Sequence, residues 1–138
     1  MVHYQYSYQY GKAQESKVLP LIREFFQRNI QSYPETFSKH DFFDDIYNYE
    51  LKSRTNTKAR YPTTMLTYNK LVGKKPLILL FNFKDKLCYI EYDEAKFQRY
   101  EKQMFSRAGF IQDEKEHVFI PIEDLKDVAI HLQVPKSE

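Results

Sequence analysis

The sequence predicts one mixed α/β domain, in which a central sheet is flanked by helices. Three observations lead to this prediction. Apolar residues recur at helical spacing between residues 14 and 30, residues 37–52 have the pattern of a β-hairpin, and residues 77–83 form an apolar run typical of a buried strand. A chain of 138 residues is long enough to bury a substantial core as one domain.

The composition excludes several kinds of site. Three glycines leave little room for a glycine-rich phosphate loop, and the single cysteine, Cys88, excludes a disulfide framework. The four histidines lack the spacing of a zinc site. The net charge of +2 is compatible with nucleic acid if the charge is segregated on the surface. With no N-terminal signal and no apolar run that could span a bilayer, we expect a cytoplasmic or nuclear protein without a membrane partner.

The N-terminal segment predicts a strand followed by a helix. Tyr occupies every second position of residues 3–10, which indicates an edge strand or an ordered arm; a row of rings for stacking on bases is the alternative. Gly11 ends this segment, and a helix is expected from Gln14 to Ile30. Its apolar stripe consists of Val18, Leu21, Ile22, Phe25 and Phe26. Pro20 removes a helical hydrogen bond, so the helix either begins near Lys17 or kinks.

Residues 37–52 predict the hairpin around which the chain is organised. A strand over residues 37–43 leads through a four-residue turn, Asp44 to Tyr47, into a second strand. This register pairs residue 43 with 48, 42 with 49 and 41 with 50. Glu50 and Lys52 lie two positions apart and therefore point to one face, whereas Leu51 points to the core.

This register places Asp41 opposite Glu50. Directly paired residues have Cβ atoms roughly 5 Å apart, so two carboxylates there repel each other unless a cation lies between them. With Lys52 beside them, the pattern indicates a divalent-metal site with a positioned lysine. A shorter turn would instead make Asp44 or Asp45 the ligand.

An aspartate, a short turn and then Glu-x-Lys on the next strand resemble the signature of the PD-(D/E)XK nuclease superfamily, the restriction-endonuclease-like fold. The matching residues are Asp41, Glu50, Leu51 and Lys52. His40 stands where the family's signature has proline. The expected element order also resembles the family's αβββαβ core, over about residues 11–92.

The resemblance implies a metal site and a role for each matching residue. Asp41, Glu50 and the backbone carbonyl of Leu51 would bind Mg²⁺, for which Mn²⁺ can substitute. Lys52 would orient or activate the attacking water and stabilise charge on the phosphate. The family's first helix often carries glycine followed by glutamate, and Gly11 and Glu15 match this pattern. Glu15 would then complete the metal site; the alternative is a first-turn residue that the helix dipole favours.

The segment after the hairpin is rich in cations. Arg54, Lys58 and Arg60 follow the candidate site and are expected either to contact phosphates or to lie on a solvated loop. A short helix is expected from Pro62 to Leu71. Three of its polar residues are candidates for the site, namely Thr64, Tyr68 and Lys70. Lys70 is expected to bind nucleic acid, and its alternative role is a cation at the helix C-terminus.

The remaining chain predicts two strands and a C-terminal addition. The strands are expected at residues 77–83 and 87–92, and Asp93 is expected to cap a helix over residues 94–105. A charged loop at 107–117, a strand at 118–122, a helix at 123–132 and a tail at 134–138 complete the addition.

We therefore expect residues 1–138 to form a single nuclease-like domain, with an arm at 1–10, a core at 11–92 and an addition at 93–138. The expected activity is that of a Mg²⁺-dependent endodeoxyribonuclease that cuts duplex or branched DNA. A homodimer similar to the Holliday-junction resolvases of this superfamily, and a phage or viral origin, fit so small a domain. The alternative is a non-catalytic module that binds nucleic acid or protein, in which Glu50 and Lys52 form an exposed ion pair.

Overall fold

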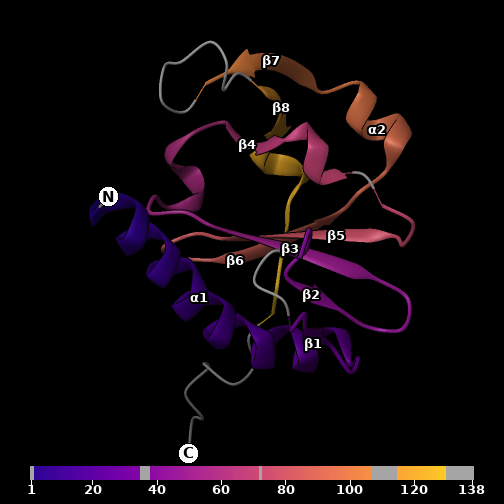
Figure 1. The fold of residues 1–138 in the computed structure, drawn as a ribbon. Coiled ribbons are helices and arrows are strands. Elements are labelled where there is room, and N and C mark those ends of the chain that lie inside the picture. The colour runs from indigo at the N-terminus through magenta and orange to yellow at the C-terminus, as the bar shows by residue number, and fades with distance from the viewer. Residues whose placement is uncertain (1, 35–37, 72, 107–114, 130–138) are drawn as a thin grey trace, which may run out of the picture.

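The protein is built in three layers, a helix, a six-stranded sheet and a three-stranded sheet (Figure 1). The computed structural model describes residues 2–34, 38–71, 73–106 and 115–129, with the backbone alone for residues 2–8. The first sheet has the order β1-β2-β3-β5-β6-β9, and the second has the order β4-β8-β7. The first sheet contains β1 (Gln31–Ser32), β2 (Phe42–Phe43), β3 (Asn48–Ser53), β5 (Leu77–Asn82), β6 (Leu87–Glu91) and β9 (Lys126–Asp127); the second contains β4 (Thr63–Thr67), β7 (Glu101–Phe105) and β8 (Lys115–Pro121).

Helix α1 (Val2–Phe26) covers one face of the first sheet. The strand expected at residues 3–10 is wrong, because this segment is helical and Gly11 lies inside the helix. The alternation of Tyr is a local signal, and no strand of the described chain pairs with this segment. Pro20 lies within the helix with its side chain exposed, and the helix ends at Phe26 rather than at residue 30.

The hairpin has the predicted register. Phe42 pairs with Tyr49 and Phe43 with Asn48, and the N–H of Asp44 donates to the carbonyl of Tyr47 at 2.9 Å, which closes the four-residue turn. The first strand of the hairpin is shorter than expected, since β2 has two residues and Asp41 lies just before it. Residues 35–37, where the strand was expected to begin, lie outside the described residues.

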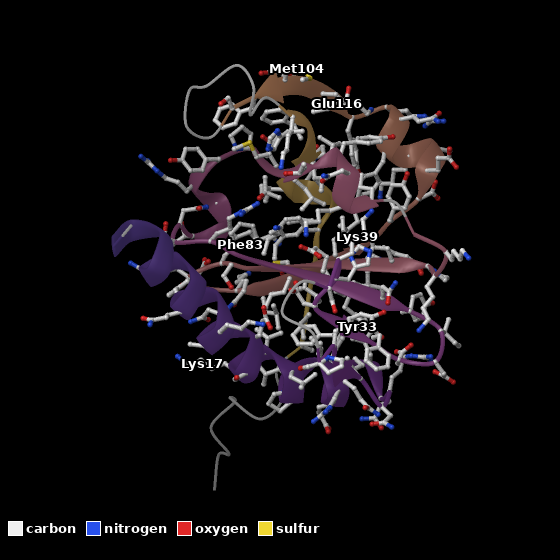
Figure 2. All side chains as sticks on the ribbon, in the orientation of Figure 1. Lys17, Tyr33, Lys39, Phe83, Met104 and Glu116 are labelled. Atoms are coloured by element: carbon white, nitrogen blue, oxygen red, sulfur yellow. The ribbon has the colours of Figure 1, made fainter. Side chains whose placement is uncertain are left out.

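Strand β5 is central to the core, as its apolar run predicts. Its side chains alternate between the two faces of the first sheet. Ile78 and Leu80 pack with α1 and with Tyr49 of β3, whereas Leu79 and Phe81 pack with β4 and β8 of the second sheet. The two sheets therefore enclose a second hydrophobic core, in which Phe83 also lies (Figure 2).

The connection from β3 to the parallel strand β5 is not the expected helix. Residues 63–67 form β4, which pairs with β8, and Tyr68–Leu71 form a 3₁₀ turn, η2; a further turn, η1, covers Lys58–Arg60. Buried and half-buried side chains alternate along β4, and three of its five residues are threonine, which favours a strand. The partner strand lies about fifty residues later in the chain, so local periodicity could not reveal the pairing.

The C-terminal part differs from its expected helices. Asp93 caps α2 as predicted and accepts from the N–H of Lys96, but α2 (Glu94–Gln98) is one short turn, and β7 follows it. Strand β8 includes residues 118–121 of the strand expected there and begins earlier. Residues 122–124 form a 3₁₀ turn, η4 (Ile122–Asp124), and β9 follows, so the expected last helix is absent up to residue 129. The expected loop at 107–114, residues 130–132 and the tail at 134–138 lie outside the described residues.

The second sheet therefore replaces the helical layer that was expected on the other face of the central sheet. Phe97 of α2 and Val118 and Ile120 of β8 are fully buried against the first sheet, so this part of the chain shares its core with residues 11–92. Among the described residues, no helix combines the length and the apolar character that a membrane crossing needs.

Candidate functional site

The candidate site lies just before the start of the short strand β2, which pairs with residues 48 and 49 of β3. Among the described residues, the middle of β3 has no paired strand on the side of β2. Asp41 occupies this position. Its backbone N–H donates to the carbonyl of Tyr49 at 3.0 Å, and its carboxylate accepts a 2.7 Å hydrogen bond from the N–H of Leu51. The carbonyl and N–H of one strand residue point to the same side, so the Leu51 carbonyl also points toward Asp41. The family resemblance implies that both of these groups belong to one site.

Glu50 is buried on the face of β3 that turns toward the second sheet. Its side chain is 4% exposed, and its neighbour on β5 is Leu79. One carboxylate oxygen, Oε1, lies 3.3 Å from Nδ1 of His40, and the other, Oε2, lies 3.3 Å from Nζ of Lys52. Nδ1 of His40 and Oε1 of Glu50 are thus within hydrogen-bonding distance of each other. The expectation that Glu50 and Lys52 share one face is confirmed by this contact.

A second lysine reaches Glu50 from the connection between β3 and β5. Nζ of Lys70, in η2, lies 4.0 Å from Oε2 of Glu50 and donates to the carbonyl of Lys39 at 3.1 Å. The other two polar candidates from this segment have different partners. Thr64 lies 3.3 Å from Nε of Arg54, and the ring of Tyr68 packs against the ammonium of Lys102.

The charges of Glu50, Glu15 and Lys52 all affect the pKa of the Asp41 carboxyl group. Burial, the negative charge of Glu50 and, more weakly, the charge of Glu15 together raise its pKa to about 7. The hydrogen bond from Leu51 and the charge of Lys52 act in the opposite direction. All four predicted catalytic residues, Asp41, Glu50, Lys52 and Glu15, are therefore close enough to interact electrostatically.

Glu15 lies at the outer edge of this cluster, on the face of α1 that carries the buried residues Val18 and Ile22. Its side chain is partly exposed and forms an ion pair with Lys12 at 3.5 Å. In the part of the chain that the structure describes, no three side chains of His, Cys, Asp or Glu converge closely enough to hold a metal ion. The convergent acidic pair is Asp41 and Glu50, with Glu15 farther out.

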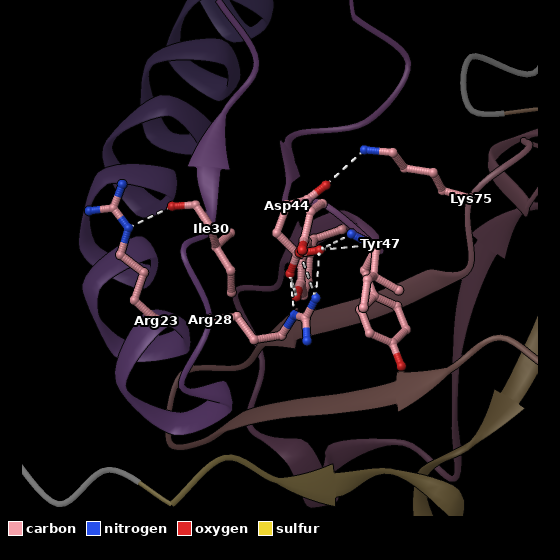
Figure 3. Close-up of polar contacts among 9 residues, drawn as sticks. Arg23, Arg28, Ile30, Asp44, Tyr47 and Lys75 are labelled. Atoms are coloured by element: carbon pink, nitrogen blue, oxygen red, sulfur yellow. Dashed lines mark hydrogen bonds and ion pairs between the residues drawn. The ribbon is translucent and has the colours of Figure 1, made fainter.

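Asp44 and Asp45 belong to a separate network at the hairpin turn (Figure 3). The buried carboxylate of Asp44 accepts from Nε of Arg28 at 2.6 Å, from the hydroxyl of Tyr49 at 2.5 Å, and from the backbone N–H groups of residues 46 and 47. These hydrogen bonds hold the pKa of Asp44 well below its usual range, against the effect of burial. Asp45 is exposed and also pairs with Arg28. These contacts give Asp44 a structural role in the turn.

The cations that were expected to contact phosphates have different surroundings. Arg54 donates to the carbonyl of Met65 at 2.5 Å and lies over the ring of Phe81. Lys58 forms an ion pair with Asp127 at 2.9 Å. Arg60 is exposed, and its guanidinium lies over the ring of Tyr61. Arg60 therefore presents its charge to solvent, whereas Arg54 joins β3 to β4.

A cleft of about 760 Å³ opens beside Lys52. Its walls come from the residues that follow β3, from β4, and from one face of β7 and β8. The residues that line it include Lys52, Arg54, Tyr61, Phe105, His117 and Phe119. Its size lies within the range of ligand-binding clefts in proteins.

His40 is the site residue whose role the sequence did not predict. It lies next to Asp41 in the chain, is 6% exposed and contacts Glu50. Because it lies just outside β2, no strand periodicity indicates its role. Its adjacency to Asp41 was the available signal for a place in the site.

No protein-family model, curated protein or solved structure matches this chain.

Proposed function

We propose that this protein is a metal-dependent nuclease that hydrolyses phosphodiester bonds in DNA, and that it acts as an endonuclease of the PD-(D/E)XK type. The observation that carries the proposal is the arrangement just before β2. The charge of Glu50 acts on the carboxyl group of Asp41 there, and Lys52 lies 3.3 Å from Glu50 at the edge of an open cleft. These are the residues of the Glu-x-Lys signature and its preceding aspartate, in the predicted register.

The order of the elements supports the proposal. Helix α1 is followed by the antiparallel strands β1, β2 and β3, and β5 then lies parallel to β3. This order agrees with αβββαβ, except that the connection to the last strand contains β4 and two 3₁₀ turns instead of a helix. The second sheet is an addition to that order.

Asp41 and Glu50 are suitable ligands for a hard cation. Carboxylate and carbonyl oxygens with water are the ligands that Mg²⁺ prefers, and Mn²⁺ accepts the same set. The pKa of Asp41 is raised partly by the charge of Glu50, and a bound cation relieves this repulsion. Asp41, Glu50 and the Leu51 carbonyl would hold Mg²⁺, with Glu15 completing the site through water. When bound, such an ion polarises a phosphate and lowers the pKa of a water molecule.

The roles of the protein's own residues follow from their positions. Lys52 lies between Glu50 and the cleft, so its ammonium can stabilise negative charge on a phosphate and orient the attacking water. His40 holds the second oxygen of Glu50, and Lys70 adds positive charge on the same side. Duplex or branched DNA is the proposed substrate, and a homodimer would cut two strands.

The test is cleavage of labelled duplex, single-stranded and four-way-junction DNA, and of RNA, in Mg²⁺, Mn²⁺ or EDTA. We expect cleavage that requires the metal and that Lys52→Ala and Glu50→Gln abolish. Lys86→Ala is the matched control, because Lys86 is an exposed lysine that pairs with Asp127 outside the candidate site. Loss of cleavage in Lys86→Ala, or equal cleavage in Lys52→Ala, would refute the assignment.

One observation favours the alternative of a binding module. Both oxygens of Glu50 already have partners in His40 and Lys52, and the described residues do not gather three metal ligands. The expectation that Glu50 and Lys52 form an exposed ion pair is wrong, however, because Glu50 is buried. A protein that binds DNA equally well with and without Mg²⁺, and cuts none of the substrates, would establish the module.

A further inference from the structure

We propose that the cleft beside Lys52 binds single-stranded DNA, with unpaired bases stacked on the aromatic side chains of its walls. The proposal builds on the nuclease function, because Lys52 lines the cleft, and it adds a site for an unpaired strand of the branched DNA that the nuclease is proposed to cut. Binding is measured without cleavage, so the two proposals can fail separately.

The first argument is the position of the aromatic rings. Met65 pairs with Phe119 and Thr67 with His117, so these side chains lie on the same face of the second sheet. Phe105 meets the ring of His117 edge to face, at 5.5 Å between the ring centres. This face points away from the core between the sheets, which is formed by alternating residues such as Leu66 and Val118. The rings therefore line the cleft instead of packing inside the protein.

The second argument is exposure. Tyr61 is 53% exposed and Phe105 is 41% exposed, although both are large apolar groups that folding normally buries. They lie on different walls of one cleft, and Arg60 adds a cation over the ring of Tyr61. Exposed aromatic rings beside cations are the features by which proteins bind single strands, because every base has a face that can stack.

The third argument is charge. The cleft is lined by the cations Lys52 and Arg54 and by several threonine hydroxyls, and among the described residues none that lines it is acidic. This positive charge complements the phosphate backbone of a single strand that runs along the floor of the cleft, with its bases directed to the walls. Duplex DNA offers phosphates but keeps its bases paired and stacked, so it cannot use the rings.

His117 contributes a ring with a fixed orientation to this surface. Its Nδ1 lies 2.9 Å from the carbonyl of Lys115 and therefore carries a proton, and its Nε2 lies 3.4 Å from the hydroxyl of Thr67. With Nδ1 as the donor, Nε2 can accept the hydroxyl proton of Thr67. The ring is thus held by two neighbours, with its orientation set before DNA binds.

The experiment measures binding of a fluorescent fifteen-nucleotide oligothymidine and of a blunt duplex hairpin, by anisotropy, in EDTA to prevent metal-dependent cutting. The variants are Tyr61→Ala, Phe105→Ala and the conservative Tyr61→Phe. The matched control is Met104→Ala, since Met104 is 59% exposed and adjacent to Phe105 on β7 but, by strand alternation, points to the opposite face.

We expect Tyr61→Ala and Phe105→Ala each to weaken binding of the single strand by about fivefold or more, which corresponds to the lower range for loss of one stacked base. Binding of the hairpin should change by less than about twofold, and Tyr61→Phe should bind like the wild type because the ring remains. The dependence of binding on salt should not change, since no cation is removed.

Three results would overturn the proposal. These are equal weakening of single-strand and duplex binding, equal weakening by Met104→Ala, or single-strand binding that is insensitive to both aromatic substitutions. Circular dichroism and thermal unfolding of each variant exclude misfolding as the cause of a loss. Cleavage that fails while these binding results hold would refute the nuclease and leave the single-strand site.

Discussion

The backbone N–H of Leu51 donates a 2.7 Å hydrogen bond to the carboxylate of Asp41, just before β2 begins. The side chain of Asp41 thus takes the place of a backbone carbonyl as the hydrogen-bond acceptor for Leu51 of β3. This hydrogen bond fixes the carboxylate of Asp41 beside Glu50, in spite of the repulsion between their charges. The shortness of β2 is therefore what creates the acidic pair.

The first prediction concerns pH. The pKa of Asp41 rises from its ordinary value of 3.8 to about 7 in the folded protein. Between these values the folded state holds more protons than the unfolded state, so the contribution of Asp41 to stability falls as pH rises and is fully lost above pH 7. We expect Asp41→Asn to be more stable than the wild type by about 1–3 kcal/mol at pH 8, and to lose this advantage near pH 4.

Urea unfolding in EDTA across this pH range measures the difference between the two proteins. The Asn side chain still offers an oxygen to the N–H of Leu51, so the hydrogen bond is retained. A difference in stability that does not vary with pH would contradict the raised pKa.

The second prediction concerns metal binding to the folded protein. An ion that binds the folded state alone raises stability by about 2.7 kcal/mol at one hundred times its dissociation constant. We expect Mg²⁺ or Mn²⁺ to raise the Tm of the wild type by several degrees, and EDTA to reverse this effect. Asp41→Asn and Glu50→Gln should show no such rise. Scanning calorimetry checks this, and a Tm of the wild type that is unchanged at millimolar Mn²⁺ would count against the metal site.

The third prediction separates Asp44 from Asp41. Asp44→Asn weakens the pairing with Arg28 inside a buried network, so we expect a loss of about 2–4 kcal/mol in the free energy of unfolding. Asp45→Asn should cost less than about 1 kcal/mol, because Asp45 is exposed. Both variants should keep the effect of Mg²⁺ on Tm. If Asp44→Asn abolishes that effect at a temperature where the protein is folded, Asp44 is a ligand.

The fourth prediction concerns Arg60. If its exposed guanidinium contacts a phosphate, Arg60→Ala should weaken DNA binding and reduce the slope of binding against salt by about one. Lys86→Ala removes an exposed charge whose partner is Asp127 and should leave the slope unchanged. Binding titrations at several salt concentrations measure both slopes. Equal slopes for the two variants would mean that Arg60 lies on a solvated loop.

Local patterns were informative where the partner was near in sequence. The register of the hairpin, its turn, the apolar strand β5 and the cap at Asp93 all depend on neighbouring residues, and all four were predicted. The errors lie in residues 3–10, β4, β7 and the C-terminal turns. Strand β4 was taken for a helix because its partner β8 lies far along the chain, and short segments of mixed periodicity fit either state.

The sequence by itself determined the pairing of residues 42 and 43 with 49 and 48, and the placement of Lys52 beside Glu50, because strand alternation and a short turn leave few other arrangements. The tertiary structure alone decided that His40 and Lys70 reach the same carboxylate, and that a second sheet, with its aromatic cleft, covers the face on which Lys52 lies. These contacts join residues that are distant in the chain or outside any regular element. They depend on how the helix and the two sheets pack, and the periodicity of apolar residues along the chain does not indicate that packing.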